Sequence, residues 1–206
     1  VTLEALKEMH LTPEDIQLIQ NDTKTCPDTG MAGASRSLYM DGNATIIAAN
    51  KLLAAMRKED GTLRTYDEMK AEGIETKYLG RYETNTTPGL CRLDPNTGIG
   101  DPTPAFTYCL NLAEVEVDTK TGKTTVLKFT CVDFVGRIGN IDAVNGQAYS
   151  GIMHGIGFAL KEDYADVKKH ANMFGAGTSY IKDVPDDINL IHIDGAISDG
   201  PFGSSG

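Results

Sequence analysis

The clearest pattern in the chain is a helical repeat of apolar and small residues that starts at Ala32 and ends near Lys58. Steps of three and four residues separate its members, as on one face of an α-helix; they are Ser35, Leu38, Tyr39, Gly42, Ile46, Ala49, Leu53 and Met56. A shorter repeat of the same kind spans Val1 to Met9, and TYDEMKAEG (65–73) has the composition of a short capped helix. We therefore predict one long core-facing helix with a short helix before it and another after it.

A two-residue alternation further along the chain predicts a β-hairpin. Ala113, Val115 and Val117 alternate with the carboxylates at 114, 116 and 118, and the returning stretch Thr124 to Val132 alternates likewise. DTKTGK lies between the two stretches as a turn. We expect the apolar residues to share one buried face and the carboxylates to be solvated. Further short strands are predicted over 15–20, 77–82 and 185–194.

A second long helix is predicted to begin near Asp142, and four glycines interrupt it, at 146, 151, 155 and 157. Each interior glycine costs about 1 kcal/mol relative to alanine, so close packing against another element or a cofactor is needed to explain them. Packing within the core alone is the alternative. Helices mixed with an antiparallel pair in this order indicate an α+β fold, with long helices on a mixed or antiparallel sheet. We expect 1–206 to be part of one domain, with 1–84 and 105–206 as two lobes joined by a loop-rich stretch.

Composition narrows the class of protein. The 206 residues are 40% hydrophobic, which is enough for a core, and the net charge of -10 disfavours binding to nucleic acid. Neither an apolar run of membrane-spanning length nor a secretory leader is visible, so we expect a cytoplasmic protein. The chain starts without Met and stops in GPFGSSG, so we expect a fragment. Its cysteines, at 26, 91, 109 and 131, form no C-x-x-C pair and are expected to be buried free thiols.

Candidate chemistry is concentrated in the segment DTGMAGASR, from Asp28 to Arg36, which directly precedes the long helix. Its small residues leave backbone N–H groups of the first helical turn open, and such groups bind phosphate. Ser35 adds a hydroxyl donor and Arg36 a guanidinium. The alternative is an ordinary tight turn in which Ser35 caps the helix. The spacing differs from that of a nucleoside-triphosphate loop.

The glycine-rich helix offers a second candidate, because Gln147, Gly151 and His154 share one helical face. An amide and an imidazole on that face could read the polar edge of a heterocycle, although a satisfied core histidine is the usual role of a residue such as His154. GPFGSSG (200–206) could line a pocket or be a cloned linker. No histidine has the spacing of a zinc site and no G-x-S-x-G occurs, so we assign no metal ligand and no catalytic residue to this chain.

Taken together, several blocks of this sequence resemble one family. These blocks are NDTKTCPDTGMAGASRS, GNA-x-x-x-A, AEVEVDTKTGK, GQAYSGIMHGIGFALKEDY and DGPFGSSG, in this order over nearly the whole chain. They are similar to the C-terminal part of the molybdopterin-binding region in xanthine oxidase family molybdenum hydroxylases, and most similar to the bacterial aldehyde oxidoreductase branch. The resemblance implies an oxidoreductase that converts aldehydes to carboxylic acids with water as the oxygen source. It also implies that the fragment alone is inactive.

The resemblance further implies how a cofactor would be held. Residues Met31, Ala32, Gly33, Ala34, Ser35 and Arg36 would hold the pterin or the pyrophosphate of molybdopterin cytosine dinucleotide, and Gln147 would hydrogen-bond it near the metal. The protein supplies no direct metal ligand in this family. Its catalytic glutamate is expected just beyond Gly206, and 2Fe-2S clusters are expected on the rest of the polypeptide, in a protein that is a homodimer when complete. A non-catalytic cofactor-binding or assembly module, and a hydroxylase of purines or N-heterocycles, remain alternatives.

Overall fold

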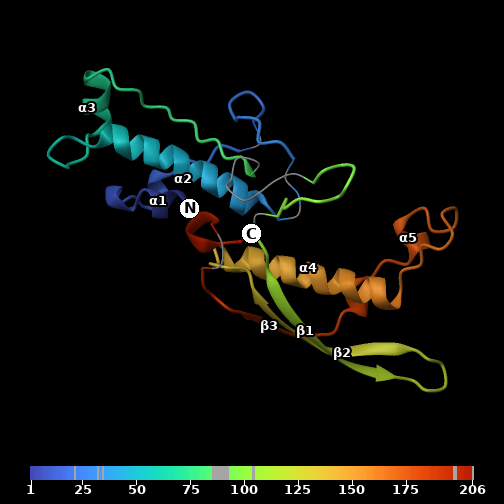
Figure 1. Cartoon of the computed structure of the whole chain (residues 1–206). Coiled ribbons are helices and arrows are strands. Elements are labelled where there is room, and N and C mark those ends of the chain that lie inside the picture. The colour runs from blue at the N-terminus through green and yellow to red at the C-terminus, as the bar shows by residue number, and fades with distance from the viewer. Residues whose placement is uncertain are drawn as a thin grey trace. The chain divides into compact units, whose positions relative to one another are not determined.

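The computed structural model describes residues 1–20, 22–31, 33, 35–84, 93–103, 105–196 and 199–205. The chain divides into two compact units, which are described separately (Figure 1). The first unit comprises Val1–Phe106 together with Ala196–Gly206, and the second comprises Thr107–Gly195.

The first unit is built around helix α2, Ser37–Met56. Its other elements are short: α1 (Thr2–Ala5), α3 (Tyr66–Ala71) and the 3-10 turns Lys7–Met9, Pro13–Asp15 and Pro201–Gly203. The buried residues of α2 are Tyr39, Gly42, Ala49 and Met56. All four belong to the predicted helical repeat, so its inward face is confirmed.

Helix α2 begins five residues later than the sequence pattern predicted, which corrects the expected start at Ala32. Ser35 has φ +56°, in the left-handed region, and Arg36 is the N-cap. Since a left-handed residue cannot continue a right-handed helix, α2 does not extend back through Ser35. The short capped helix is confirmed as α3, where the Thr65 hydroxyl accepts the Glu68 N–H and the Glu68 carboxylate accepts the Thr65 N–H.

Two strands predicted in this unit do not form. Residues 16–20 follow the turn Pro13–Asp15 without strand pairing, and Leu18 is 76% exposed. Residues 77–82 also pair with no strand, because they run against α2. A Cβ at Gly80 would lie 1.8 Å from the carbonyl oxygen of Ala44, and the Lys51 ammonium donates to the Leu79 carbonyl over 2.9 Å.

Residues 200–205 of the C-terminal GPFGSSG segment are an integral part of the first unit, so the alternative of a linker is wrong. Pro201, Gly203 and Ser204 are buried. A Cβ on Gly42 of α2 would lie 2.4 Å from the Pro201 Cγ, so this glycine is required for the loop to approach the helix. The sequence alone could not show which element this loop would pack on.

The second unit contains a three-stranded sheet in the order β1-β2-β3, with helix α4 on one face (Figure 1). Its elements are β1 (Tyr108–Val117), β2 (Thr124–Phe134), α4 (Ile141–Leu160), α5 (Met173–Ala176), a 3-10 turn (Ile181–Asp183) and β3 (Asp187–His192). β1 and β2 are antiparallel, whereas β2 and β3 are parallel. The predicted hairpin, the final strand, the helix near Asp142 and the α+β class with a mixed sheet are therefore confirmed.

The core of this unit lies under β2 and β3. It consists of Val126, Cys131, Ile152 and Ile156, with Phe129, Ile188 and Leu190 packed against it. The expected burial of Ala113, Val115 and Val117 is wrong, because β1 is exposed along its whole length and both valines are 50% exposed. Val115 pairs with the core residue Val126, as the predicted hairpin requires. However, β1 is an edge strand and contributes no residue to this core.

Candidate functional site

The loop that precedes α2, which we call the pre-helix loop (28–36), has a backbone shaped by two left-handed residues. Gly30 has φ +70° and Ser35 has φ +56°. The Asp28 carboxylate accepts the Gly30 N–H over 2.9 Å, which closes a local turn. Met31 is 81% exposed beyond this turn. Ala32 and Ala34, which the sequence also assigned to the site, lie outside the described residues.

The pre-helix loop ends on a helix start that carries no side-chain cap. Arg36 rather than Ser35 is the N-cap, and it makes no side-chain capping hydrogen bond. The alternative in which Ser35 caps the helix is therefore wrong. The first turn of α2 contains no acidic residue, so the positive end of this 20-residue helix has no carboxylate of its own.

Arg36 also lacks a carboxylate partner within the described part of the chain. The ion pairs found there do not include it, whereas Arg57, at the other end of α2, pairs with Glu8 over 2.5 Å. Arg36 is exposed. A guanidinium at the start of a long helix, in no ion pair with the described residues, is suited to binding an anionic group.

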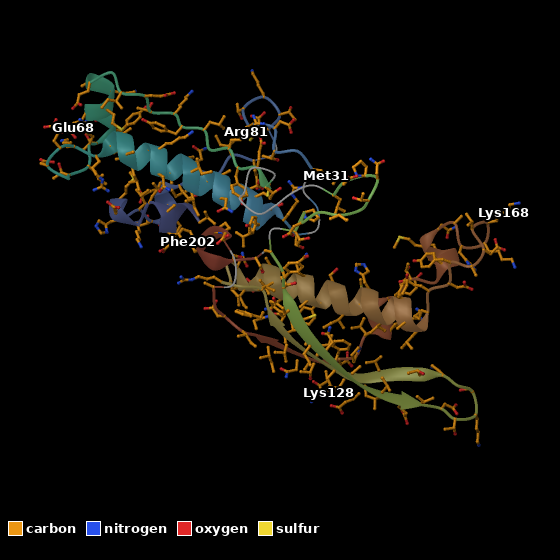
Figure 2. All side chains as sticks on the ribbon, viewed as in Figure 1. Met31, Glu68, Arg81, Lys128, Lys168 and Phe202 are labelled. Carbon is orange, nitrogen blue, oxygen red and sulfur yellow. The ribbon has the colours of Figure 1, made fainter. Side chains whose placement is uncertain are left out.

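A cavity of about 1100 Å³ opens beside this arginine within the first unit. Its walls are the start of the pre-helix loop, the face of α2 from Met40 to Ala48, and the extended segment Leu79–Thr84. Figure 2 shows the side chains of this unit, with Met31 and Arg81 labelled. The Arg81 guanidinium pairs with the Glu83 carboxylate over 2.5 Å, so Arg36 is the cavity-lining arginine that remains without an ion pair among the described residues.

Two tyrosines pack against each other at the first turn of α2. Tyr39 is 2% exposed, and its ring meets that of Tyr82 edge to face, with centroids 6.0 Å apart. Burial, then the hydrogen bond with the Tyr82 side chain, raises the pKa of Tyr39 far above its usual range. Tyr39 is therefore a neutral packing residue. A Cβ at Gly200 would lie 2.8 Å from its ring, so the C-terminal loop also rests on this tyrosine.

In the second unit, Gln147, Gly151 and His154 lie on one helix, α4, as predicted, and all three are exposed. The alternative that His154 is a core histidine is therefore wrong. A Cβ at Gly146, Gly151 or Gly155 would meet nothing within 4 Å. Of the four glycines in this helix, only Gly157 shows the close packing that was expected to explain them. A Cβ there would lie 2.7 Å from the Ser179 hydroxyl.

The described cysteines differ in burial. Cys131 is buried, Cys26 is partly buried and Cys109 is exposed, so the expectation of buried thiols holds for Cys131 alone, and Cys91 lies outside the described residues. Burial is the main cause that raises the pKa of Cys131. The described residues contain no cluster of three or more acidic, histidine or cysteine side chains suited to a metal ion. No helix among them is long and apolar enough to cross a membrane.

The sequence reasoning missed one buried polar cluster in this unit. His192 on β3 contacts Asp133 on β2 and Asn145 on α4. Sequence spacing could not reveal this cluster, because Asn145 and Asp133 lie 47 and 59 residues before His192 in the chain. Asp133 meets His192 only when β2 and β3 pair.

Comparison with known proteins defines the class. The molybdopterin cofactor-binding domain family matches residues 2–185, and the chain belongs to this family. The resemblance to xanthine oxidase family molybdenum oxidoreductases is thereby confirmed.

Individual relatives make the comparison more specific. The chain is 42% identical to the aldehyde oxidoreductase of Megalodesulfovibrio gigas over 203 residues, which is 98% of this chain and 22% of that protein. It is 28% identical to a probable hypoxanthine oxidase of Escherichia coli K12, over 99% of this chain and 23% of that protein. The crystal structure of the aldehyde oxidoreductase from Desulfovibrio desulfuricans matches with a TM-score of 0.88 and 45% identity, over 100% of this chain and 22% of that one. The chain thus spans about a fifth of the length of these relatives.

Proposed function

We propose that this chain is the molybdopterin-binding portion of an enzyme that oxidises aldehydes to carboxylic acids with water as the oxygen source. The observation that carries the proposal is Arg36 at the start of α2, in no ion pair with the described residues and beside a cavity of about 1100 Å³, in a chain of the molybdopterin-binding family. Identity of 42% to an aldehyde oxidoreductase, against 28% to a probable hypoxanthine oxidase, favours aldehydes over purines.

The donor set of the pre-helix loop fits an anionic cofactor. Guanidinium groups bind phosphate oxygens in pairs, and N–H groups at a helix start add further donors. A Cβ at Gly30 would have no neighbour within 4 Å, and Met31 is exposed, so the backbone there is open to a ligand. These features suit the pyrophosphate of a cytosine dinucleotide form of the cofactor.

Each candidate residue then has a role toward that group. Met31–Arg36 would hold the pterin or the pyrophosphate, and Gln147 would offer its amide as a hydrogen-bonding group near the metal. When bound, the molybdenum cofactor supplies the two-electron oxidation of the substrate. The chain's own part is to bind and orient it, with Arg36 neutralising phosphate charge and the small loop residues permitting close approach.

Catalytic groups are proposed to lie on other parts of the whole protein. The general base is a glutamate that follows Gly206, and 2Fe-2S clusters carry the electrons away. We propose that 1–206 forms part of a single cofactor-binding domain, and that the complete protein is a cytoplasmic homodimer. The 206 residues alone bind the cofactor weakly and turn nothing over.

The experiment that tests the substrate is a dye-reduction assay of the purified whole protein with a series of aldehydes and with hypoxanthine. The proposal predicts a higher kcat/KM for at least one aldehyde than for the purine. Reduction driven by hypoxanthine but by no aldehyde would reject the aldehyde assignment while leaving the cofactor assignment intact. The 206-residue chain, assayed alone, should give no aldehyde-dependent reduction.

A further inference from the structure

His192, at the end of β3, makes hydrogen bonds through both nitrogens of its ring. Its Nδ1 lies 2.7 Å from the Asp133 Oδ1 on β2, and its Nε2 lies 2.7 Å from the Asn145 Oδ1 on α4. The side chains of His192 and Asp133 are only 8% and 11% exposed. The strand register pairs the same two residues directly. One buried ring therefore joins two strands and a helix.

This cluster contacts the half of α4 in which no residue is fully buried. The buried residues of α4 are Ile152, Ile156 and Gly157, all in its C-terminal half. In the N-terminal half, 141–151, no residue is buried. Asn145 supplies a polar contact from this half to the sheet, and the Asp194 carboxylate accepts the Ile138 N–H over 3.3 Å just before the helix.

The hydrogen bond at Asn145 also sets the rotation of the helix. Successive helical residues are about 100° apart, so Gln147 lies about 200° from Asn145, on nearly the opposite face. Asn145 points to the sheet, whereas Gln147 is exposed beside Gly146 and Gly151, whose Cβ positions are open. Fixing Asn145 against His192 therefore fixes the direction in which Gln147 projects.

The Asn145 amide suits this task because it can serve either protonation state of the ring. The Asp133 carboxylate accepts an N–H from Nδ1. When Nε2 carries a proton, the Asn145 oxygen accepts it, and when Nε2 carries a lone pair, a flipped amide donates to it. The polar side chains that contact the ring are Asp133 and Asn145. An apolar side chain at 145 would leave Nε2 without an acceptor or donor.

We propose that His192, oriented by Asp133 and acting through Asn145, is a positioning residue for Gln147. The inference rests on the proposed function, in which Gln147 hydrogen-bonds the molybdenum cofactor. It assigns no chemical step to His192 itself.

The test compares Asn145→Leu, Asn145→Asp and the control Ile152→Val in the whole protein. Amide hydrogen exchange over 145–151 and the molybdenum and pterin content per chain are measured. In Asn145→Leu we expect faster exchange over 145–151 and a loss of cofactor of about tenfold or more, the usual effect of removing a group that orients a ligand. Asn145→Asp keeps an oxygen acceptor but loses the amide donor, so it should retain more cofactor than Asn145→Leu. Ile152→Val should speed exchange in the C-terminal half and retain the cofactor.

Unchanged exchange over 145–151 in Asn145→Leu would overturn the inference, and so would faster exchange with full cofactor content. The variant Gln147→Ala separates this failure from that of the proposed function. If Gln147→Ala loses cofactor and Asn145→Leu does not, only the positioning role is wrong. If Gln147→Ala also keeps its cofactor, the assignment of Gln147 is wrong and the positioning role falls with it.

Discussion

Replacing Arg36 by glutamine removes the positive charge at the start of α2 while keeping a hydrogen-bonding side chain of similar length. Arg36 has no ion-pair partner in the described part of the chain, so the substitution breaks no internal salt bridge. A hydrogen bond between charged groups contributes about 1.5–3 kcal/mol. Since each 1.4 kcal/mol is about a tenfold change in affinity, we expect cofactor affinity to fall about ten- to hundredfold.

The matched control for this prediction is Arg57→Gln, at the opposite end of the same helix. Arg57 pairs with Glu8, and both side chains are about half exposed, at 44% and 50%. Such surface pairs contribute less than about 1 kcal/mol, so the control should be nearly as stable as the wild type and keep its cofactor.

The assay is the molybdenum and pterin content of each purified whole protein, before and after gel filtration at rising salt. Arg36→Gln should lose cofactor at every salt concentration, and the wild type should lose it progressively as salt screens the exposed charge. Equal cofactor content in Arg36→Gln and Arg57→Gln would refute the assignment of an anion site to this arginine.

Two further predictions concern stability. Gly42→Ala should lower the free energy of unfolding by about 1–3 kcal/mol, the usual cost of overpacking, because its Cβ would lie 2.4 Å from the Pro201 Cγ. Asn50→Ala, on the exposed side of the same helix, should be neutral or slightly stabilising, and equal denaturation midpoints for the two variants would contradict the packing argument. The hydrogen bond from the Lys58 ammonium is the main cause that lowers the pKa of Glu68 to about 2. Its folded pKa lies below the ordinary value of 4.5, so the stabilisation is present above that pH and is lost as pH falls toward 2. Glu68→Gln should therefore lower Tm at pH 7, with a difference from wild type that shrinks as the pH is lowered; a constant difference would contradict this account.

Sequence pattern predicted the elements whose partners are close in the chain. The α2 face, the hairpin around Gly122 and the capping box of Thr65 and Glu68 follow from residues within a few positions of one another. Predictions of secondary structure failed where packing against a segment distant in sequence decides the conformation. Residues 77–82 have the composition of a strand, yet Gly80 packs against the backbone of α2.

In the candidate site, too, local features could be predicted from sequence and features that depend on distant segments could not. The pre-helix loop could be found from sequence because its small residues directly precede a strong helical repeat. Arg36, and not Ser35, occupies the N-cap position because the backbone at Ser35 is left-handed, which side-chain type does not predict. The prediction that one face of β1 is buried was wrong. An alternating pattern shows which residues share a face of a strand, but not whether another element packs on that face. The cluster of Asp133 and His192 needs the parallel pairing of β2 with β3.

The most direct test of the central claim is the cofactor content of the whole native protein. Elemental analysis gives the molybdenum content per chain, and acid release followed by chromatography gives the cytidine nucleotide. The account predicts molybdenum together with a stoichiometric amount of cytidine nucleotide, held by a domain in which Arg36 faces the phosphate groups. A folded whole protein, purified from its source, that contains neither molybdenum nor a pterin nucleotide would contradict it.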